Sequence, residues 1–424
     1  MSTTAVTDSS VTPERAPSRV MSGLREDYNV TLVNEWSPYL GGILLVMVNS
    51  ILMLSGLFWG VFGGLKLWGD WFNNLIGLGP MLNIAGTLES PLLHRISLMD
   101  ISLIIGAFTA ALLSRQFALR RPPKQEYVNA ALGGSLMGVG ATLAGGCTTG
   151  GFFSPLMFQS AAGWVMWAGL LLGAFLGLKA LLWAMENITW GTVPPARSEF
   201  APSKSLSPWI GFAVLAAVVW WATSWYGSPD EKLAARGIVV LVGFAQGFIL
   251  HRSRFCTARV FREPFMTAEG EMTKAMILAL AVGIPISSLL LQHKTVDPFL
   301  GIPPTFWVGS LVGGVIFGIG MVFAGGCATG SMWRMGEGHL KLWVAVFFFS
   351  WIGSIFSAVT KLTGLMVRET DLELMVDTTK VGYQAYMPDM FGGWSWVYLL
   401  SAVMLLVWYA LVRYNESTEK FTVL

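Results

Sequence analysis

The chain has 424 residues, of which 54% are hydrophobic and 12% are charged, and its formal net charge is +2. Soluble domains carry about 25% charged residues, so this composition excludes an ordinary soluble globular protein. The near-neutral charge, without a basic cluster, argues against a nucleic-acid partner. A mean hydropathy of +0.60 instead predicts an all-α polytopic membrane protein in contact with the lipid bilayer.

The N-terminal residues 1–37 are polar, with prolines and arginines and no apolar stretch. This pattern predicts a disordered cytoplasmic tail rather than a signal peptide. Ten apolar runs follow, each close to the 20 residues that cross a hydrocarbon core of roughly 30 Å. They lie at 39–60, 98–117, 126–144, 162–185, 207–226, 233–250, 272–292, 304–324, 340–360 and 394–412.

Shorter segments lie between these runs. We expect short, surface or partly inserted helices at 67–78, 152–160, 256–266 and 330–337, and an exposed loop at 361–392. Asp100, near the start of the second run, is expected to mark the membrane interface rather than to belong to an intramembrane proton relay.

An internal repeat relates each residue of one segment to the residue 180 positions later. Four glycines of the third run recur in the eighth, and both copies end in a Gly-Gly-Cys element. The first element is Gly145-Gly146-Cys147-Thr148-Thr149-Gly150, and the second is Gly325-Gly326-Cys327-Ala328-Thr329-Gly330. The repeat divides the chain into a first membrane repeat at 38–228, a second at 229–415 and a C-terminal cytoplasmic tail at 416–424.

The number of runs in each half predicts how the halves cross the membrane. Five is odd, so the second half must enter the membrane upside down relative to the first, an architecture of transporters and channels. Lysine and arginine concentrate in the loops after even-numbered runs, including Arg120 after the second and Arg254 after the sixth. The positive-inside rule places these loops, and both termini, in the cytoplasm.

The chain has only three cysteines: Cys147, Cys327 and Cys256. They are far apart in sequence, so a disulfide framework is not expected, and four scattered histidines do not predict a metal site. A single buried cysteine is usually a small apolar residue. Here the thiol instead recurs at matching places, after a pair of glycines and before a short helix. Because the N-terminus of a helix attracts anions, this arrangement suggests a binding site. Sulfur is soft, so thiols suit a ligand with terminal sulfur or selenium.

The predicted substrate site combines the three thiols with the residues around them. Arg254 could attract an anion or only set the topology, and Thr149 and Thr329 could donate hydroxyls to an anion or cap the short helices. We predict no catalytic residue, cofactor or metal ligand. The full predicted set is Cys147, Cys256, Cys327, Gly145, Gly146, Thr149, Gly150, Arg254, Gly325, Gly326, Thr329 and Gly330.

Three motifs resemble those of the YeeE/YedE family of bacterial inner-membrane proteins, the sulfur-transport domain proteins. They are Leu143-Ala-Gly-Gly-Cys147, the segment from Arg252 to Glu263, and the segment from Phe323 to Gly338; the loop from Leu88 to Arg95 is closer to the YedE branch. The resemblance implies an hourglass-like inverted-repeat fold that takes up thiosulfate past a series of cysteines. For the YedE branch it implies selenium compounds, and it suggests a soluble sulfurtransferase-like partner.

One departure from the family pattern concerns the cysteines. The thiosulfate-carrying branch has a further cysteine in its first half, before the Gly-Gly-Cys element. In this chain a 180-residue shift of Cys256 falls on Ile76, and that region has no cysteine. The chain has Cys256 in its second half instead. This difference affects the expected substrate more than the expected fold.

The sequence therefore predicts a permease for thiosulfate or a related soft sulfur anion in a bacterial inner membrane, and not an enzyme. No phosphate-binding Gly-x-x-x-x-Gly-Lys-Ser/Thr loop is present, so ATP hydrolysis would not drive it. The alternatives are a selenite-type transporter, a thiol-based sulfur or redox sensor of the membrane, and a structural membrane subunit.

Overall fold

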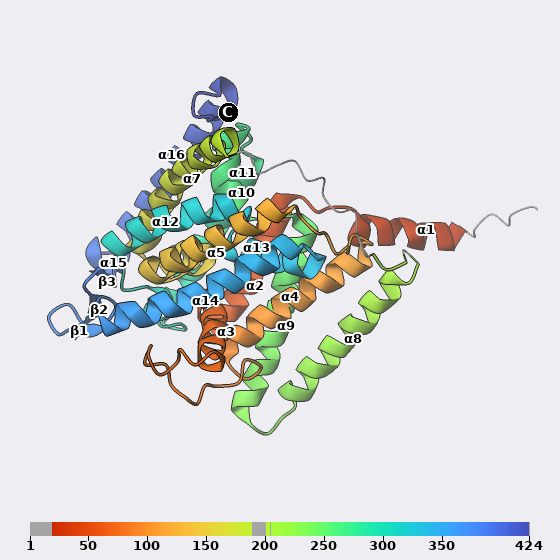
Figure 1. The fold of residues 1–424 in the computed structure, drawn as a ribbon, viewed down its shortest axis with the longest axis horizontal. Helices are drawn as coiled ribbons and strands as arrows, with labels where there is room; N and C mark the ends of the chain where they lie inside the picture. Colours follow the sequence, from red (N-terminus) through yellow and green to blue (C-terminus); the bar gives the residue numbers. More distant parts are fainter. Residues whose placement is uncertain (1–18, 189–200, 204, 424) are drawn as a thin grey trace, which may run out of the picture.

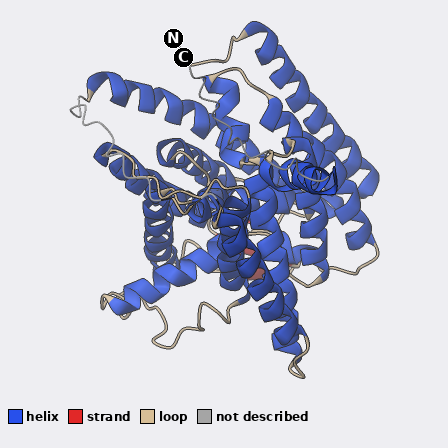
Figure 2. Cartoon of the chain, turned by 90° about the vertical axis from the view of Figure 1, so that its right-hand side faces the viewer, coloured by secondary structure: helices blue, strands red, loops and turns tan. Residues whose placement is uncertain are grey.

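The structure, a computed structural model, describes residues 19–188, 201–203 and 205–423. Helices make up most of it, and strands form one small sheet (Figures 1 and 2). Within these residues, nine helices are long and apolar enough to cross a membrane, or ten if the bent pair Ser22–Val33 and Pro38–Leu54, which meet at 74°, is one span. The predicted helical, polytopic membrane protein is confirmed.

The helices of the first half follow the predicted runs closely, and residues 67–78 fall largely within a helix that begins at Phe62. In chain order the elements are α1 (Arg19–Tyr28), the π-helix η1 (Asn29–Val33), α2 (Pro38–Leu54), α3 (Phe62–Leu75), α4 (Arg95–Leu113), α5 (Lys124–Ala144), the π-helix η2 (Thr148–Phe153), α6 (Ser154–Met157), α7 (Ala161–Asn187) and α8 (Ser207–Tyr226).

The second half contains a similar series, with the small sheet before its last span. Its elements are α9 (Glu231–Ser253), α10 (Thr257–Met266), α11 (Glu271–Gln292), the 3₁₀-helix η3 (Pro298–Gly301), α12 (Val308–Ala324), α13 (Ala328–Glu337), α14 (Leu340–Leu362), β1 (Glu369–Asp371), β2 (Val376–Thr379), β3 (Gly382–Tyr383), α15 (Met387–Met390) and α16 (Trp394–Thr418).

The N-terminal region differs from the disordered tail that its polarity predicted. Residues 19–33 form α1 and η1, and tertiary contacts account for the difference. The Tyr28 hydroxyl donates to the Leu113 carbonyl, and the Arg252 guanidinium donates to the Val33 carbonyl at 2.8 Å. These bonds attach the segment to the ends of α4 and α9, which the local sequence does not reveal. Residues 1–18 of the predicted tail lie outside the described residues.

The segment expected as an exposed loop at 361–392 also differs. Strands β1, β2 and β3 form an antiparallel sheet in sequence order. The β-branched residues of β2 favour extended backbone, and the sheet is attached to the chain before α12. The Thr379 hydroxyl donates to the Pro304 carbonyl at 2.8 Å, and the Gly309 amide donates to the Val381 carbonyl at 3.0 Å.

The centre of the molecule is formed by α5, α7, α12 and α14: α12 packs against α5 and α7, and α14 packs against α5. In Figure 1 the ribbons of α5, α12 and α14 run side by side. Glycines allow this close packing. A methyl carbon added at Gly138 would lie 2.8 Å from the Gly353 nitrogen, and one added at Gly318 would lie 2.8 Å from the Gly173 Cα. Adding 180 to the number of Gly138 gives Gly318, and subtracting 180 from the number of Gly353 gives Gly173. The contacts between the halves are therefore reciprocal, as a two-fold repeat requires.

The outer helices follow the same reciprocity. Gly243 of α9 lies against Met99 of α4, and Gly42 of α2 lies against Ala279 of α11. Met99 and Ala279 are again 180 residues apart, whereas Gly42 and Gly243 are 201 apart. The offset changes because the connection 76–94 between α3 and α4 is longer than the connection 267–270 between α10 and α11. The opposite membrane orientation of the halves remains a prediction.

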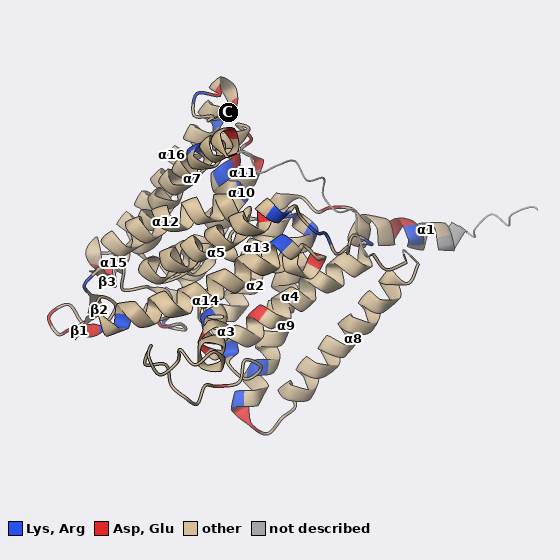
Figure 3. Cartoon of the chain, in the orientation of Figure 1, with Lys and Arg blue, Asp and Glu red and all other residues tan. Residues whose placement is uncertain are grey.

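The distribution of charge agrees with a membrane environment. Helices α8 and α12 contain no charged residue at all, and in Figure 3 most charged positions lie near helix ends and in connections. Long uncharged helices of this kind are stable in a hydrocarbon core because all their backbone groups are paired internally.

Candidate functional site

Both Gly-Gly-Cys elements end a long central helix in the same way. Gly145 closes α5 with a φ of 75°, and Gly325 closes α12 with a φ of 80°. This left-handed backbone favours glycine over residues with a side chain. The cysteine then starts the predicted short helix: Cys147 precedes η2, and Cys327 precedes α13. The first copy is a π-turn followed by a short helix, and the second is a regular helix.

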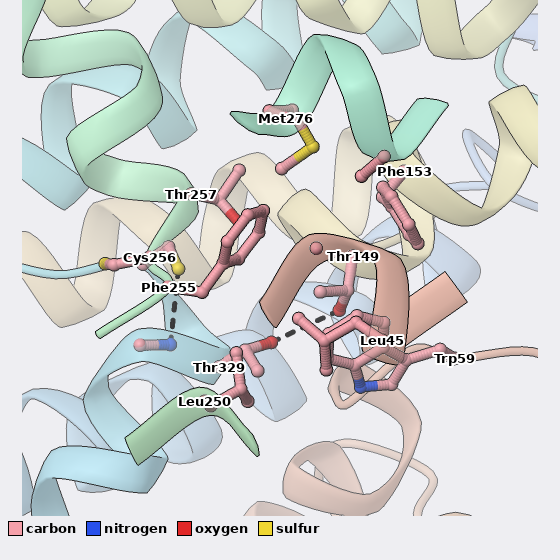
Figure 4. A pocket seen from close by; sticks show the side chains of 14 residues that line it. Leu45, Trp59, Thr149, Phe153, Leu250, Phe255, Cys256, Thr257, Met276 and Thr329 are labelled. Carbon is pink, nitrogen blue, oxygen red and sulfur yellow. Dashed lines mark hydrogen bonds between the residues drawn. The ribbon is translucent and has the colours of Figure 1, made fainter. Parts of the chain in front are cut away.

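The two elements meet at a pair of threonines. The hydroxyls of Thr149 and Thr329 are 3.2 Å apart, and the residues are 180 positions apart in sequence. Figure 4 shows the two side chains pointing toward each other. The Cys147 sulfur lies 3.0 Å from the Thr149 hydroxyl. The repeat-related residues therefore touch at the boundary between the halves, and the first thiol is linked to the second half through two hydroxyls.

The other two thiols are adjacent. Cys256 lies immediately before α10. Its sulfur and that of Cys327 lie beside the same residue, Gly330, whose amide donates to the Cys327 sulfur at 3.2 Å. Both sulfurs lie over Gly330, where an added methyl carbon would be 2.7 Å from Cys256 Sγ and 3.1 Å from Cys327 Sγ. All three cysteines are buried and none forms a disulfide.

The structure corrects the residue that corresponds to Cys256 in the first half. Ile76 caps the C-terminus of α3, whereas Cys256 precedes the N-terminus of α10. By contact the corresponding residue is Gly60, because Gly60 lies against Gly150 as Cys256 lies against Gly330, while Val61 is the residue directly before α3. The shift of 180 fails here because the halves differ in loop length. In this chain one half thus places a glycine where the other half places a thiol.

These residues surround a small buried cavity. Its volume of about 10 Å³ accommodates roughly one water-sized sphere, so the site is closed in this conformation. The hydroxyls of Thr149 and Thr329, the thiols of Cys256 and Cys327, and the ring of Trp59 line it (Figure 4). Phe153, Phe255, Thr257 and Met276 complete much of the wall.

Several polar atoms around the cavity are buried without a hydrogen-bond partner. These include the Trp59 Nε1–H and the Thr148 hydroxyl. Buried donors normally find a partner, so unpartnered ones beside a cavity indicate groups available to a ligand. Sequence reasoning missed both residues because neither is repeated. Trp59 lies outside the repeated element, and the second copy has Ala328 in place of Thr148.

Not every predicted residue lines the cavity. Gly330 does, whereas Gly145, Gly146, Gly150, Gly325 and Gly326 shape the turns around it and are not among its lining residues. Cys147 is also outside the lining, one hydrogen bond away through Thr149.

Arg254 is directed away from the cavity. Its guanidinium pairs with Glu35 at 2.9 Å and with Glu337 at 3.0 Å, and donates to the Gln116 side chain at 2.7 Å. Glu337 is almost completely buried and also pairs with Arg120 at 3.1 Å. Arg254 thus belongs to a charged cluster that ties α9, α13 and the N-terminal segment together, and each of its three nitrogens already donates a hydrogen bond.

Asp100 was expected to mark the membrane interface, and its depth in the membrane remains a prediction. The structure shows that its side chain is fully buried inside the helix bundle. Its position results from the packing of α3 and α9 on α4, which the hydropathy of α4 alone cannot indicate.

The fold and the site together define a class: a multi-span membrane protein whose two related halves enclose a buried, thiol-lined cavity. Comparison with known proteins specifies the family. The sulphur-transport family model matches residues 10–176 and 252–423, and the chain belongs to this family.

The relatives are named as transporters. The chain is similar to the probable transporter YedE of Escherichia coli, 27% identical over 339 residues, which cover 76% of this chain and 79% of that protein. It is 37% identical over 108 residues to the thiosulfate transporter TsuA of the same organism, and 36% identical over 110 residues to TsuA of Spirochaeta thermophila. These TsuA matches cover 26% of this chain and about a third of the relative.

Proposed function

We propose that this protein is a permease for thiosulfate or a related soft sulfur anion. The observation that carries the proposal is the arrangement of thiols and hydroxyls around one closed cavity at the boundary of the repeats. Thiosulfate has an oxygen-rich end, which suits hydroxyl and N–H donors, and a terminal sulfur, which suits thiols. The relatives named thiosulfate transporters support the same substrate class.

The proposed route passes the three thiols in sequence. Cys147 lies on the outer side under the positive-inside topology, with both termini cytoplasmic. The anion would pass from Cys147 along Thr149 and Thr329 to the cavity, and then leave past Cys256 and Cys327. Weak thiol and hydroxyl contacts suit passage because binding must be favourable but not deep. The cavity is too small for thiosulfate, so the aromatic side chains that line it, including Trp59 and Phe255, must move.

A selenium compound such as selenite is the alternative substrate, because selenium is also soft and the chain is similar to YedE over most of its length. A soluble sulfurtransferase-like protein that consumes the imported sulfur would set the direction of uptake. A thiol-based sensor is the alternative from another class of protein. The adjacent thiols of Cys256 and Cys327 favour this alternative, because two adjacent thiols can oxidise to a disulfide.

The test is uptake of radiolabelled thiosulfate into cells that lack their own thiosulfate importers. We expect uptake that excess unlabelled thiosulfate blocks and sulfate spares, and loss of uptake in Cys147→Ser and in Cys327→Ser. Ser401→Ala removes another buried hydroxyl, on α16 and away from the cavity, and should leave uptake unchanged. Normal uptake by both cysteine variants would exclude the thiol route, and selenite as the better competitor would favour the alternative substrate.

A further inference from the structure

Asp100 is a buried carboxyl group that the proposed route does not use. It lies on α4 with no exposed surface, and neither of its oxygens has a hydrogen-bond partner. Gly64 of α3 covers it so closely that an added methyl carbon would lie 2.2 Å from Oδ2. The same part of the chain also reaches the Cys147 element, because a methyl carbon added at Gly60, four residues before Gly64, would lie 3.1 Å from the Gly150 Cα.

The other charged groups near α4 are engaged elsewhere. Lys66 and Asp70 of α3 pair with each other at 2.6 Å, and α8 has no charged residue. Glu337 of α13 pairs with Arg120 and Arg254. On α9 the register of Gly243 with Met99 and of Gly247 with Leu103 places His251 at the level of Ala107, about seven residues beyond Asp100. Among the titratable groups of the described residues, Cys147 therefore belongs to the element that lies against the start of α3 next to Gly64, the residue that covers Asp100.

This environment determines the charge of the carboxyl. An ionised carboxylate without a partner is very costly inside a membrane protein, so Asp100 is held as the neutral acid. Its O–H is then a donor that has no acceptor in the protein. A carboxyl that only stabilised the fold would use its hydrogen bonds, and this one does not.

The second half provides an internal comparison. The contacts between α2 and α11 and between α4 and α9 keep α4 and α11 at the offset of 180, so Leu280 corresponds to Asp100. Leu280 is also fully buried. An aliphatic side chain of similar size therefore meets the packing requirement in the related half. Packing does not explain the carboxyl in the first half.

We propose that Asp100 is a proton-binding residue that controls the access of anions to Cys147. In its neutral form the O–H donates a hydrogen bond to the anion at Cys147, and in its ionised form the carboxylate repels the anion. The proton stays on Asp100 throughout, and no bond other than the hydrogen bond is exchanged. The inference rests on the proposed function and adds to it a dependence of anion passage on protonation.

Two variants that keep the number of side-chain heavy atoms test the inference in the full chain. Asp100→Asn cannot ionise but keeps a donor, and we expect thiosulfate uptake that no longer falls as the external pH is raised from about 5 to about 8, the interval in which buried carboxyls titrate. Asp100→Leu copies the related half and has no donor. We expect its uptake to be lower than that of the wild type at pH 5 by about tenfold or more, the effect of a hydrogen bond to a charged group.

Ser102→Ala is the matched control, because it removes another buried, unpartnered group of α4; we expect its pH profile to equal that of the wild type. Wild-type uptake and an unchanged pH profile in Asp100→Leu would overturn the inference.

A labelling experiment separates failure of the inference from failure of the proposed substrate. In a Cys256→Ser, Cys327→Ser background, Cys147 is the single thiol, and its reaction rates with an anionic and with a neutral methanethiosulfonate can be compared. The ratio of the two rates cancels the ionisation of Cys147 itself. We expect the ratio to fall with rising pH when Asp100 is present and to be constant in Asp100→Asn. Equal pH dependence in both would overturn the inference, whether or not thiosulfate is carried.

Discussion

Gly330 is the position where a single methyl group most directly perturbs the thiol pair. In Gly330→Ala the new Cβ would lie 2.7 Å from Cys256 Sγ and 3.1 Å from Cys327 Sγ, well inside the ordinary contact distance of about 3.5–4.0 Å. A Cys256 side chain that rotates away can relieve the clash. Overpacking of a closed core costs about 1–3 kcal/mol, so we expect both a lower melting temperature and separated sulfurs.

The separation of the sulfurs can be measured directly. In a Cys147→Ser background, mild oxidation should form a Cys256–Cys327 disulfide in the otherwise wild-type chain, because both sulfurs lie beside Gly330. In Gly330→Ala we expect the rate of disulfide formation to fall by about tenfold. A tenfold change corresponds to about 1.4 kcal/mol, which lies within the expected strain of about 1–3 kcal/mol. Thiosulfate uptake, measured with Cys147 present, should fall with it.

A second substitution checks that the clash is with sulfur. Cys256→Ala removes the sulfur 2.7 Å from the new methyl group, so adding Gly330→Ala to Cys256→Ala should lower the melting temperature much less than adding it to the wild type. Gly150→Ala is the related substitution in the first half, where the nearest atom is the Gly60 Cα at 3.1 Å and no thiol is close. Wild-type disulfide formation and uptake in Gly330→Ala would refute the reasoning.

Two further predictions concern hydrogen bonds and charge pairs. Thr149→Val or Thr329→Val breaks the hydroxyl pair at a cost of about 0.5–1.5 kcal/mol and should reduce uptake severalfold. Additive effects in the double variant would count against a direct contact. Thr223→Val, on the exposed surface of α8, is the control. Glu337→Gln leaves Arg254 and Arg120 without their buried partner and should cost about 3 kcal/mol of stability, seen as a lower melting temperature. Glu416→Gln, at a partly exposed pair, should cost less than about 1 kcal/mol, and an equal effect of the two would contradict the role of the cluster.

The sequence by itself determined the class of the protein and the main elements of the site. Apolar runs long enough to cross a bilayer permit only helices, because lipid offers no partner to free backbone groups. The 180-residue repeat of Gly-Gly-Cys located both turns, since only glycine readily adopts the left-handed backbone that ends α5 and α12. These signals are local, so one sequence was sufficient to read them.

The tertiary structure decided which repeated residues meet and which isolated ones join them. The Thr149–Thr329 contact, the adjacency of Cys256 and Cys327 over Gly330, and the match of Cys256 with Gly60 depend on how two halves with different loop lengths pack. Arg254 lies two residues before the candidate thiol Cys256 in the sequence, but its guanidinium pairs with Glu337 of α13. Asp100 is buried because α3 and α9 close over it. Each of these facts is a distance between segments far apart in the chain, and hydropathy and spacing carry no information about such distances.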